Sequence, residues 1–216
     1  MNKFIFFLGA TLAVSGIFSN EDKPKICPPP PSDKEQMSYS PDFLLSLAIR
    51  TQVKANHINP RNVAQINSLH KKAISYFQTY ISCAKENNIS ISANVHLLKA
   101  NSHFEIKEWN ESLLDVDSAL LLSNNQYKDA LILKSRLLIK ENKFKQAADL
   151  LESVISFYSD DSDLLYFLGS LNAETGNYPK AILYFTSLYN SIQKKEGDTK
   201  YRNFTLKYLG DIYAKK

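Results

Sequence analysis

The sequence predicts an all-α protein built as a solenoid of stacked helical hairpins. Residues 128–195 repeat with a period of 34, each copy spaces its apolar residues like a helix, and a short turn divides the better copy into two halves. A fixed period of this length is typical of stacked repeats, in which each unit buries its apolar face against its neighbours. The pattern therefore predicts an architecture, and it indicates no chemistry. The positions related by the period are Phe144 and Tyr178, Ala147 and Ala181, Leu151 and Phe185, and Val154 and Leu188.

The better copy spans residues 162–195. Its first half carries one apolar stripe, its turn is Thr175-Gly176-Asn177, and Pro179 stands where a second helix makes its first turn. Two helices joined by so short a turn must lie antiparallel and in contact. The small residues Gly169 and Ala181 let the two helices approach at the short end of the usual range of about 8–10 Å. In the copy at residues 128–161, Ser135 and Ala147 hold these places.

At these positions the chain resembles the tetratricopeptide repeat family. The family's spacing of Leu-Gly, an aromatic residue, Ala and a second aromatic residue is found at Leu168-Gly169, Tyr178, Ala181 and Phe185. The resemblance implies a right-handed superhelix in which the first helix of each hairpin lines a concave groove. The sequence departs from the family pattern where Lys134, Asn172 and Gln193 replace a Leu, an aromatic residue and a Pro.

Residues 1–19 have the features of a signal peptide. Lys3 gives a positive start, residues 4–18 are an apolar run, and small residues precede the acidic Glu21-Asp22. The run is shorter than the roughly 20 residues of a standard spanning helix. We predict cleavage after Gly16 or Ser19 and an exported, periplasmic or otherwise extracytoplasmic protein. An uncleaved signal anchor and a buried N-terminal helix are the alternatives.

Residues 20–40 form a predicted linker or tail, because Cys27 is followed by four prolines that favour an extended chain. The residues before Cys27 lack the small residue that lipidation requires, so we do not expect a lipoprotein. Cys27 and Cys83 are the two cysteines of the chain. In an exported protein they can form one disulfide, and two free thiols are the alternative.

The predicted solenoid occupies residues 41–216. It begins with an atypical hairpin at 41–87, broken at Asn59-Pro60, and continues with three repeats at about 93–126, 128–161 and 162–195. An insertion near Glu196-Gly197-Asp198 separates the last repeat from a closing helix at 202–215. That helix resembles the one that covers the last apolar face in the tetratricopeptide family.

The resemblance also implies which residues line the groove. Their mixture of amide, aromatic and oppositely charged side chains suits a protein or peptide ligand, although an ordinary solvated surface has a similar composition. The family's clamp for a C-terminal carboxylate is not expected, because Leu97, Asp163 and Phe167 replace its basic residues and only Asn101 matches. The predicted lining residues are Asn94, Leu97, Asn101, Phe104, Glu105, Asp129, Ile132, Arg136, Ile139, Lys140, Tyr166, Ser170 and Glu174.

Other classes of function find little support in the sequence. The net charge of +4 is spread without a basic run, so we expect no nucleic-acid partner. His57, His70, His96 and His103 have no metal-ligand spacing with an acid or cysteine, and no nucleophile motif occurs, so we predict no catalytic residues, metal or cofactor. We predict a non-enzymatic adaptor, with no membrane span after signal cleavage and with self-association open. A structural subunit of a cell-envelope assembly or secretion machine is the alternative.

Overall fold

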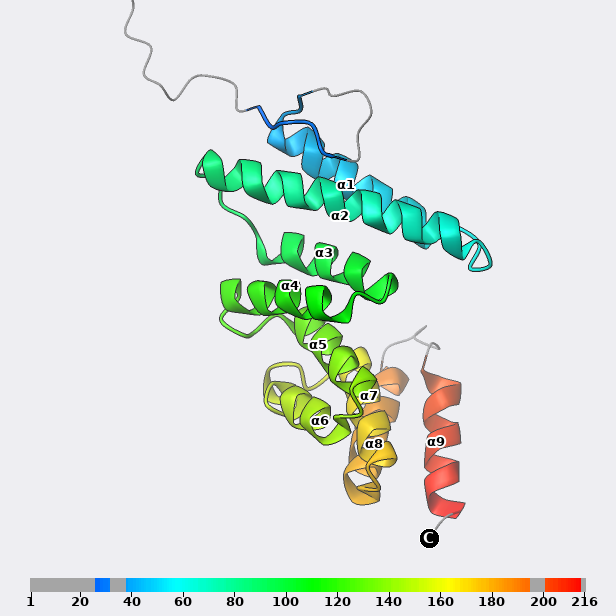
Figure 1. Ribbon diagram of the computed structural model, residues 1–216. Coiled ribbons are helices and arrows are strands. Elements are labelled where there is room, and N and C mark those ends of the chain that lie inside the picture. Colours follow the sequence, from blue (N-terminus) through cyan, green and yellow to red (C-terminus); the bar gives the residue numbers. More distant parts are fainter. Residues whose placement is uncertain (1–25, 32–37, 195–200, 215–216) are drawn as a thin grey trace, which may run out of the picture.

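The computed structural model describes residues 26–31, 38–194 and 201–214, so the predicted signal peptide and the insertion at Glu196-Gly197-Asp198 lie outside the described residues. Within this part the chain is a stack of helices that runs from the N-terminal hairpin to the C-terminal helix (Figure 1). The helices are α1 (Pro41–Asn56), α2 (Val63–Glu86), α3 (Ala93–Glu105), α4 (Trp109–Leu122), α5 (Lys128–Lys140), α6 (Phe144–Glu152), α7 (Ser162–Glu174), α8 (Tyr178–Lys194) and α9 (Arg202–Ala214).

The prediction of an all-α hairpin solenoid is confirmed. Helices pack most extensively within the pairs α1–α2, α3–α4, α5–α6 and α7–α8, and each pair contacts the next through α2–α3, α4–α5 and α6–α7. The aromatic residues Trp109, Phe144 and Tyr178, which the repeat pattern aligns, are the first residues of α4, α6 and α8. Their common place shows that the three hairpins share one register.

The turns inside these three hairpins share one geometry. Lys107, Asn142 and Gly176 each have positive φ, at 66°, 61° and 76°. The next residue in each case donates its backbone N–H to a carbonyl five residues back, at 2.8–2.9 Å, which ends the first helix in a left-handed cap. Only one of the three positions holds glycine, so a glycine-based search for the turn finds a single copy.

The second helix of the repeat at 128–161 is shorter than its counterpart. The alignment of Val154 with Leu188 predicts that both residues lie in the second helix, but α6 ends at Glu152 and Ile155–Phe157 forms one turn of 3-10 helix. Val154 still packs in the core at 7% exposure. Val154 is thus buried like Leu188 in the next repeat, although it lies outside α6.

Gly169 accommodates an aromatic ring. A Cβ added there would lie 2.7–2.9 Å from ring atoms of Phe185, which is fully buried. Ala181 is also fully buried, but the side chain that lies against Gly169 is Phe185. The small residue therefore makes room for a neighbouring ring within the last hairpin, beyond the general approach of two backbones that the sequence predicts.

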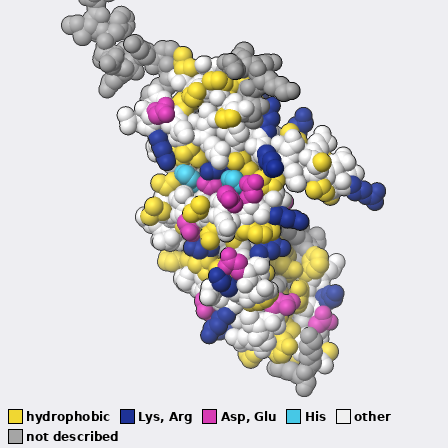
Figure 2. Space-filling view, in the orientation of Figure 1, with side chains coloured by type: hydrophobic (Ala, Val, Ile, Leu, Met, Phe, Trp, Pro, Cys, Tyr) yellow, Lys and Arg dark blue, Asp and Glu magenta, His cyan; other side chains and the backbone are white. Residues whose placement is uncertain are grey.

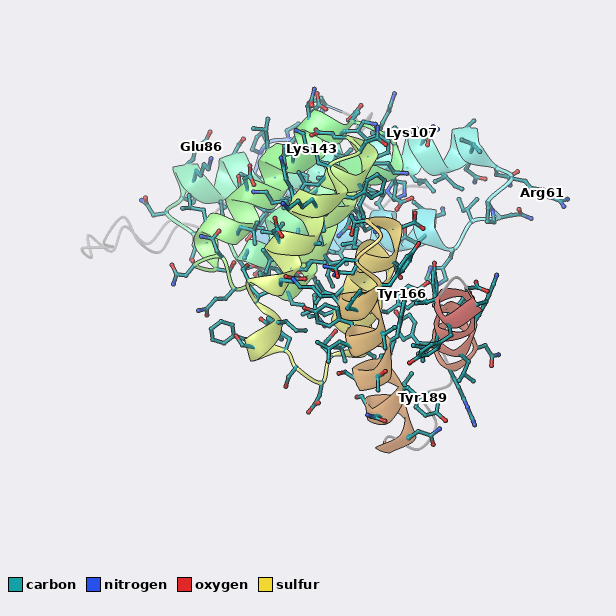
Figure 3. The ribbon with its side chains drawn as sticks, turned by 90° about the horizontal axis from the view of Figure 1, so that it is seen from below. Arg61, Glu86, Lys107, Lys143, Tyr166 and Tyr189 are labelled. Atoms are coloured by element: carbon teal, nitrogen blue, oxygen red, sulfur yellow. A yellow bond between two sulfur atoms is a disulfide. The ribbon has the colours of Figure 1, made fainter. Side chains whose placement is uncertain are left out.

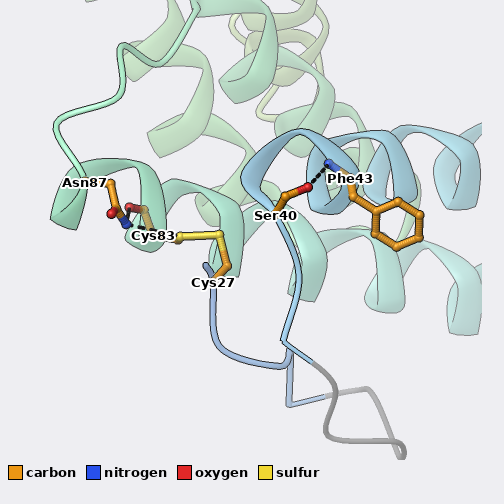
Figure 4. The surroundings of a disulfide bond; sticks show 5 residues. All are labelled: Cys27, Ser40, Phe43, Cys83 and Asn87. Atoms are coloured by element: carbon orange, nitrogen blue, oxygen red, sulfur yellow. Dashed lines mark hydrogen bonds between the residues drawn. A yellow bond between two sulfur atoms is a disulfide. The ribbon is translucent and has the colours of Figure 1, made fainter. Parts of the chain in front are cut away.

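The N-terminal segment is fixed to the end of α2 by a disulfide between Cys27 and Cys83, whose Cα atoms are 5.4 Å apart (Figure 4). Cys27 and Tyr39 also exchange two backbone hydrogen bonds, at 2.7 and 3.1 Å. The Ser40 side chain then caps α1 by accepting from the N–H of Phe43. Of the two states that the sequence leaves open for the cysteines, the structure contains the disulfide.

We expect Gly169→Ala to lower the free energy of unfolding by about 1–3 kcal/mol, because the Phe185 ring must move to admit the methyl group. Gly210→Ala is the matched control, since no atom lies within 4 Å of its added Cβ in α9. Helix propensity predicts that this control stabilises by up to about 1 kcal/mol. Denaturant unfolding of both variants tests this, and equal stabilities would contradict the packing described for Gly169.

Removal of the disulfide by Cys27→Ser with Cys83→Ser should destabilise the protein by up to about 4 kcal/mol. The bond closes a loop with a sequence separation of 56, and a loop of this length restricts the unfolded chain by that order of free energy. Chemical denaturation with and without a reductant provides the measurement. The reductant should lower the stability of the wild type and leave the double variant unchanged, and any other pattern would rule out a stabilising disulfide.

Candidate functional site

Two first helices of neighbouring hairpins, α3 and α5, lie side by side and hold cations over aromatic rings. The guanidinium of Arg136 in α5 lies 4.3 Å from the ring centre of Phe104 in α3, and Lys140 Nζ lies 5.8 Å from that of Trp109. Phe104 and Trp109 meet edge to face at 5.1 Å. Contacts between a cation and a ring of this kind are worth about 0.5–2 kcal/mol each, so both cations are held in place.

The predicted groove residues divide into exposed and buried groups. Leu97 and Phe104 are only 5% and 7% exposed and belong to the central core, so they support the surface from below. At the edge of this surface, Glu105 is exposed, and Ile132 and Ile139 are half-buried. The exposed members are Asn94, Asp129, Lys140 and Glu174, and the half-buried ones are Asn101, Arg136 and Ser170.

Two amides of the predicted groove are engaged within the protein. Asn94 accepts a hydrogen bond from the Tyr127 hydroxyl at 3.0 Å, which ties the start of α3 to the residue that precedes α5. The Asn101 amide donates to the carbonyl of Leu97, also at 3.0 Å. The first bond links α3 to the residue before α5, and the second lies within α3.

Tyr166 is covered by the C-terminal helix and the residue before it. Its ring stacks on that of Tyr201 at 4.8 Å and meets Phe204 and Tyr208 edge to face at 6.3 Å each. Figure 3 shows Tyr166 between α7 and α9. Burial raises the pKa of its hydroxyl. The predicted groove position on α7 is thus partly filled by the protein itself, and the surface that remains accessible centres on α3 and α5.

A charged cluster that the sequence analysis did not predict joins α3 to α4. Asp115 in α4 forms an ion pair with Lys99 at 2.8 Å and lies 3.8 and 3.7 Å from the imidazoles of His96 and His103. His103 Nδ1 also contacts Glu108 Oε2 at 2.6 Å. In Figure 2 this cluster is the group of histidine and acidic side chains on the middle of the molecule.

The sequence analysis considered only metal-ligand spacing, so it did not predict that Asp115 and Glu108 lie beside these histidines. Lys99 and Asp115 are equally far from Lys107 in the turn, and residues placed in this way face each other across an antiparallel hairpin. That symmetry was the available signal. The described residues contain no group of three or more His, Cys, Asp or Glu side chains that could hold a metal ion. The cluster instead joins two helices by charge.

Comparison of the whole chain with known proteins gives similarity in structure alone. No protein-family model and no curated protein matches the sequence. A crystal structure of MamA superposes with a TM-score of 0.51 at 17% identity, covering 74% of this chain and 95% of that one. BtubC from P. vanneervenii gives 0.57 at 14% identity, with 82% and 84% covered. A tetratricopeptide repeat protein from Parabacteroides merdae gives 0.51 at 16% identity, with 80% and 66% covered.

The chain has a tetratricopeptide-repeat fold. Phe104 lies on α3, Arg136 and Lys140 lie on α5, and Trp109 is the first residue of α4. None of the helices in the described ranges combines the length and hydrophobicity of a membrane span.

Separately from the cluster between α3 and α4, polar contacts join the atypical N-terminal hairpin to the tetratricopeptide repeats. Gln52 in α1 donates to Ser102 Oγ at 2.9 Å and to the carbonyl of Leu98 at 2.5 Å, both in α3. His70 in α2 lies against the same hydroxyl, with Nδ1 to Oγ at 3.4 Å, and is 1% exposed. Burial lowers the pKa of His70, and the negative charge of Glu105 opposes this only in part.

Acid should weaken this junction through His70. Because the pKa of His70 is below its usual 6.5 in the folded protein, its contribution to stability is present above that pH and is lost as the pH falls through the folded pKa. The loss proceeds at no more than about 1.4 kcal/mol per pH unit.

We therefore expect wild type to lose more stability between pH 7.5 and pH 5 than His70→Gln does, as measured by denaturant unfolding at both pH values. His57→Gln is the control, since His57 is exposed at the end of α1 and should behave like wild type. Identical pH dependence of His70→Gln and His57→Gln would show that His70 does not couple the junction to pH.

Proposed function

We propose that this protein is an exported, non-catalytic scaffold that holds a protein or peptide partner in the groove over α3 and α5. The observation that carries this proposal is the pair of cations, Arg136 and Lys140, held over the rings of Phe104 and Trp109. A charged side chain that is already ordered loses less conformational entropy when it binds a ligand, so a fixed cation is a better anchor than a free one.

The charge pattern of the groove favours a polypeptide as the ligand. Arg136 and Lys140 lie near one end of α5, and Asp129 is exposed in its first turn. A surface with both signs suits a peptide with acidic and basic side chains, whereas a phosphate backbone requires a continuous basic track. The Cys27–Cys83 disulfide and the features of residues 1–19 support an extracytoplasmic location.

A second candidate, a structural subunit of a cell-envelope machine, is favoured by one observation. Helix α4 exposes Leu114 and Leu121 at 70% and 78%, together with Leu122 at 53%. Exposed leucines grouped on one helix indicate a surface for permanent association. In this role the partner binds α4 and does not depend on the groove.

Crosslinking and pull-down from the native cell's envelope fraction distinguishes the two roles. We expect Arg136→Glu with Lys140→Glu to reduce capture of the main partner at least tenfold, because the variant reverses both fixed cations. Lys145→Glu with Lys207→Glu makes the same charge change at exposed residues of α6 and α9 and should retain the partner. Thermal melts establish that each variant is folded.

Loss of the partner from Leu114→Gln with Leu121→Gln, and its retention by the groove variant, would contradict the groove proposal and support the structural subunit. Equal loss from the groove variant and its charge-matched control would show that net charge, and no particular surface, governs capture.

A further inference from the structure

The N-terminal hairpin is basic over its whole length. No Asp or Glu occurs between Asp42, at the start of α1, and Glu86, the last residue of α2. The basic residues of the same stretch are Arg50, Lys54, Arg61, Lys71, Lys72 and Lys85. Elsewhere in the described chain, lysines pair with acids on other helices, as in Lys134–Asp117 and Lys180–Glu152. The hairpin contains no acids along its length for such pairs.

The second half of α1 borders a shallow hollow of about 550 Å³. Its lining combines an apolar row, Ile49, Val53 and Ile58, with the cations Arg50 and Lys54 beside it. Val53 is 47% exposed although it is a large apolar residue. No described acid lies within ion-pair distance of Arg50 or Lys54. The hollow therefore offers an apolar floor and an unneutralised positive edge.

The position of this hollow in the solenoid explains why it is open. Each inner hairpin packs against a neighbour on both sides, but α1 is the first helix of the stack and packs mainly on α2. The N-terminal segment held by the Cys27–Cys83 disulfide lies near the first half of α1, where Leu44 is fully buried and Tyr39 packs on the same core cluster.

On the side that lines the hollow, the other half of α1 has no such cover from the described chain, while Gln52 on another side of the helix contacts α3. The end of the α1–α2 hairpin extends beyond α3, and Arg61 marks its far end (Figures 1 and 3). The open half of α1 thus lies where a stacked repeat would place a preceding helix.

We propose that the open half of α1 is a docking surface for an acidic, amphipathic helix of a partner protein. Apolar side chains of that helix pack on Ile49, Val53 and Ile58, and its carboxylates lie against Arg50 and Lys54. Complementary charge sets the orientation of the helix and speeds its association, while the apolar row provides burial. This surface is separate from the groove over α3 and α5.

Among anionic partners, the shape favours a helix over a lipid bilayer. A hollow receives side chains that project from a rod, whereas peripheral proteins bind a bilayer by inserting projecting apolar groups. The apolar residues here line the hollow.

Fluorescence anisotropy of a labelled peptide tests the proposal with the disulfide-bonded protein. The probe has about 15 residues, a length at which helix formation begins to be appreciable, with Leu at every fourth position and Glu beside each Leu. We expect it to bind wild type at low salt, and to bind Arg50→Glu with Lys54→Glu at least tenfold more weakly. Val53→Asn should also weaken binding. The same peptide with Lys in place of Glu should not bind.

Lys71→Glu with Lys85→Glu is the matched control, because it changes the net charge equally at exposed residues of α2 outside the hollow. It should retain most of the affinity. Equal weakening by the two double variants would overturn the proposal in favour of non-specific charge attraction.

Absence of peptide binding, with wild type instead binding phosphatidylglycerol vesicles through Arg50 and Lys54, would overturn the proposal in favour of a membrane surface. The groove variant Arg136→Glu with Lys140→Glu should bind the peptide like wild type, so this surface and the groove can fail independently.

Discussion

The structure depends on close packing between the two helices of each hairpin, which residues without large side chains make possible. In the last hairpin the absence of a side chain at Gly169 admits the ring of Phe185, and Ala181 is fully buried nearby. In the two preceding hairpins Ser112 and Ser135 are fully buried, and their hydroxyls donate to the carbonyls of Ala100 and Ala147 across the same interface. A small hydroxyl and a missing side chain are thus two solutions to the same constraint, since a buried hydroxyl is tolerated when it finds a partner.

A stack of this kind has two ends, and the chain treats them differently. At the C-terminal end, Tyr201 and the residues of α9 surround Tyr166 with aromatic rings and bury Ile212 against the last hairpin. At the N-terminal end, a disulfide holds a short segment near one half of α1. The C-terminal end thus covers Tyr166, a predicted groove residue, whereas partial covering of the N-terminal end leaves a basic, apolar hollow.

The sequence predicted the elements that depend on local pattern and failed where distant residues meet. Helix α1 and the starts of α4, α6 and α8 were predicted because apolar spacing, proline and aromatic positions are local signals. The pairing of Tyr166 with Tyr201 was missed, since an insertion interrupts the period between them. Asp115 was missed because a hairpin places it beside His96 and His103 only after the turn closes. Of the groove, the positions were predicted, but the burial of Leu97 and Phe104 required the neighbouring helices.

The distribution of charge gives the two ends of the molecule different electrostatic character. In the repeats, ion pairs such as Lys99–Asp115 and Lys128–Asp161 use charge to join helices and hairpins, so little of it is left unneutralised at those places. The hairpin α1–α2 has no internal acids, and its cations face solvent at one end of an elongated molecule (Figure 2). Within about a Debye length, some 8–10 Å in physiological salt, such an end attracts an anionic partner before contact. For the docking that we propose at α1, this polarity would place an acidic partner at the N-terminal end of the elongated molecule, so charge would contribute to the direction of association as well as to its affinity.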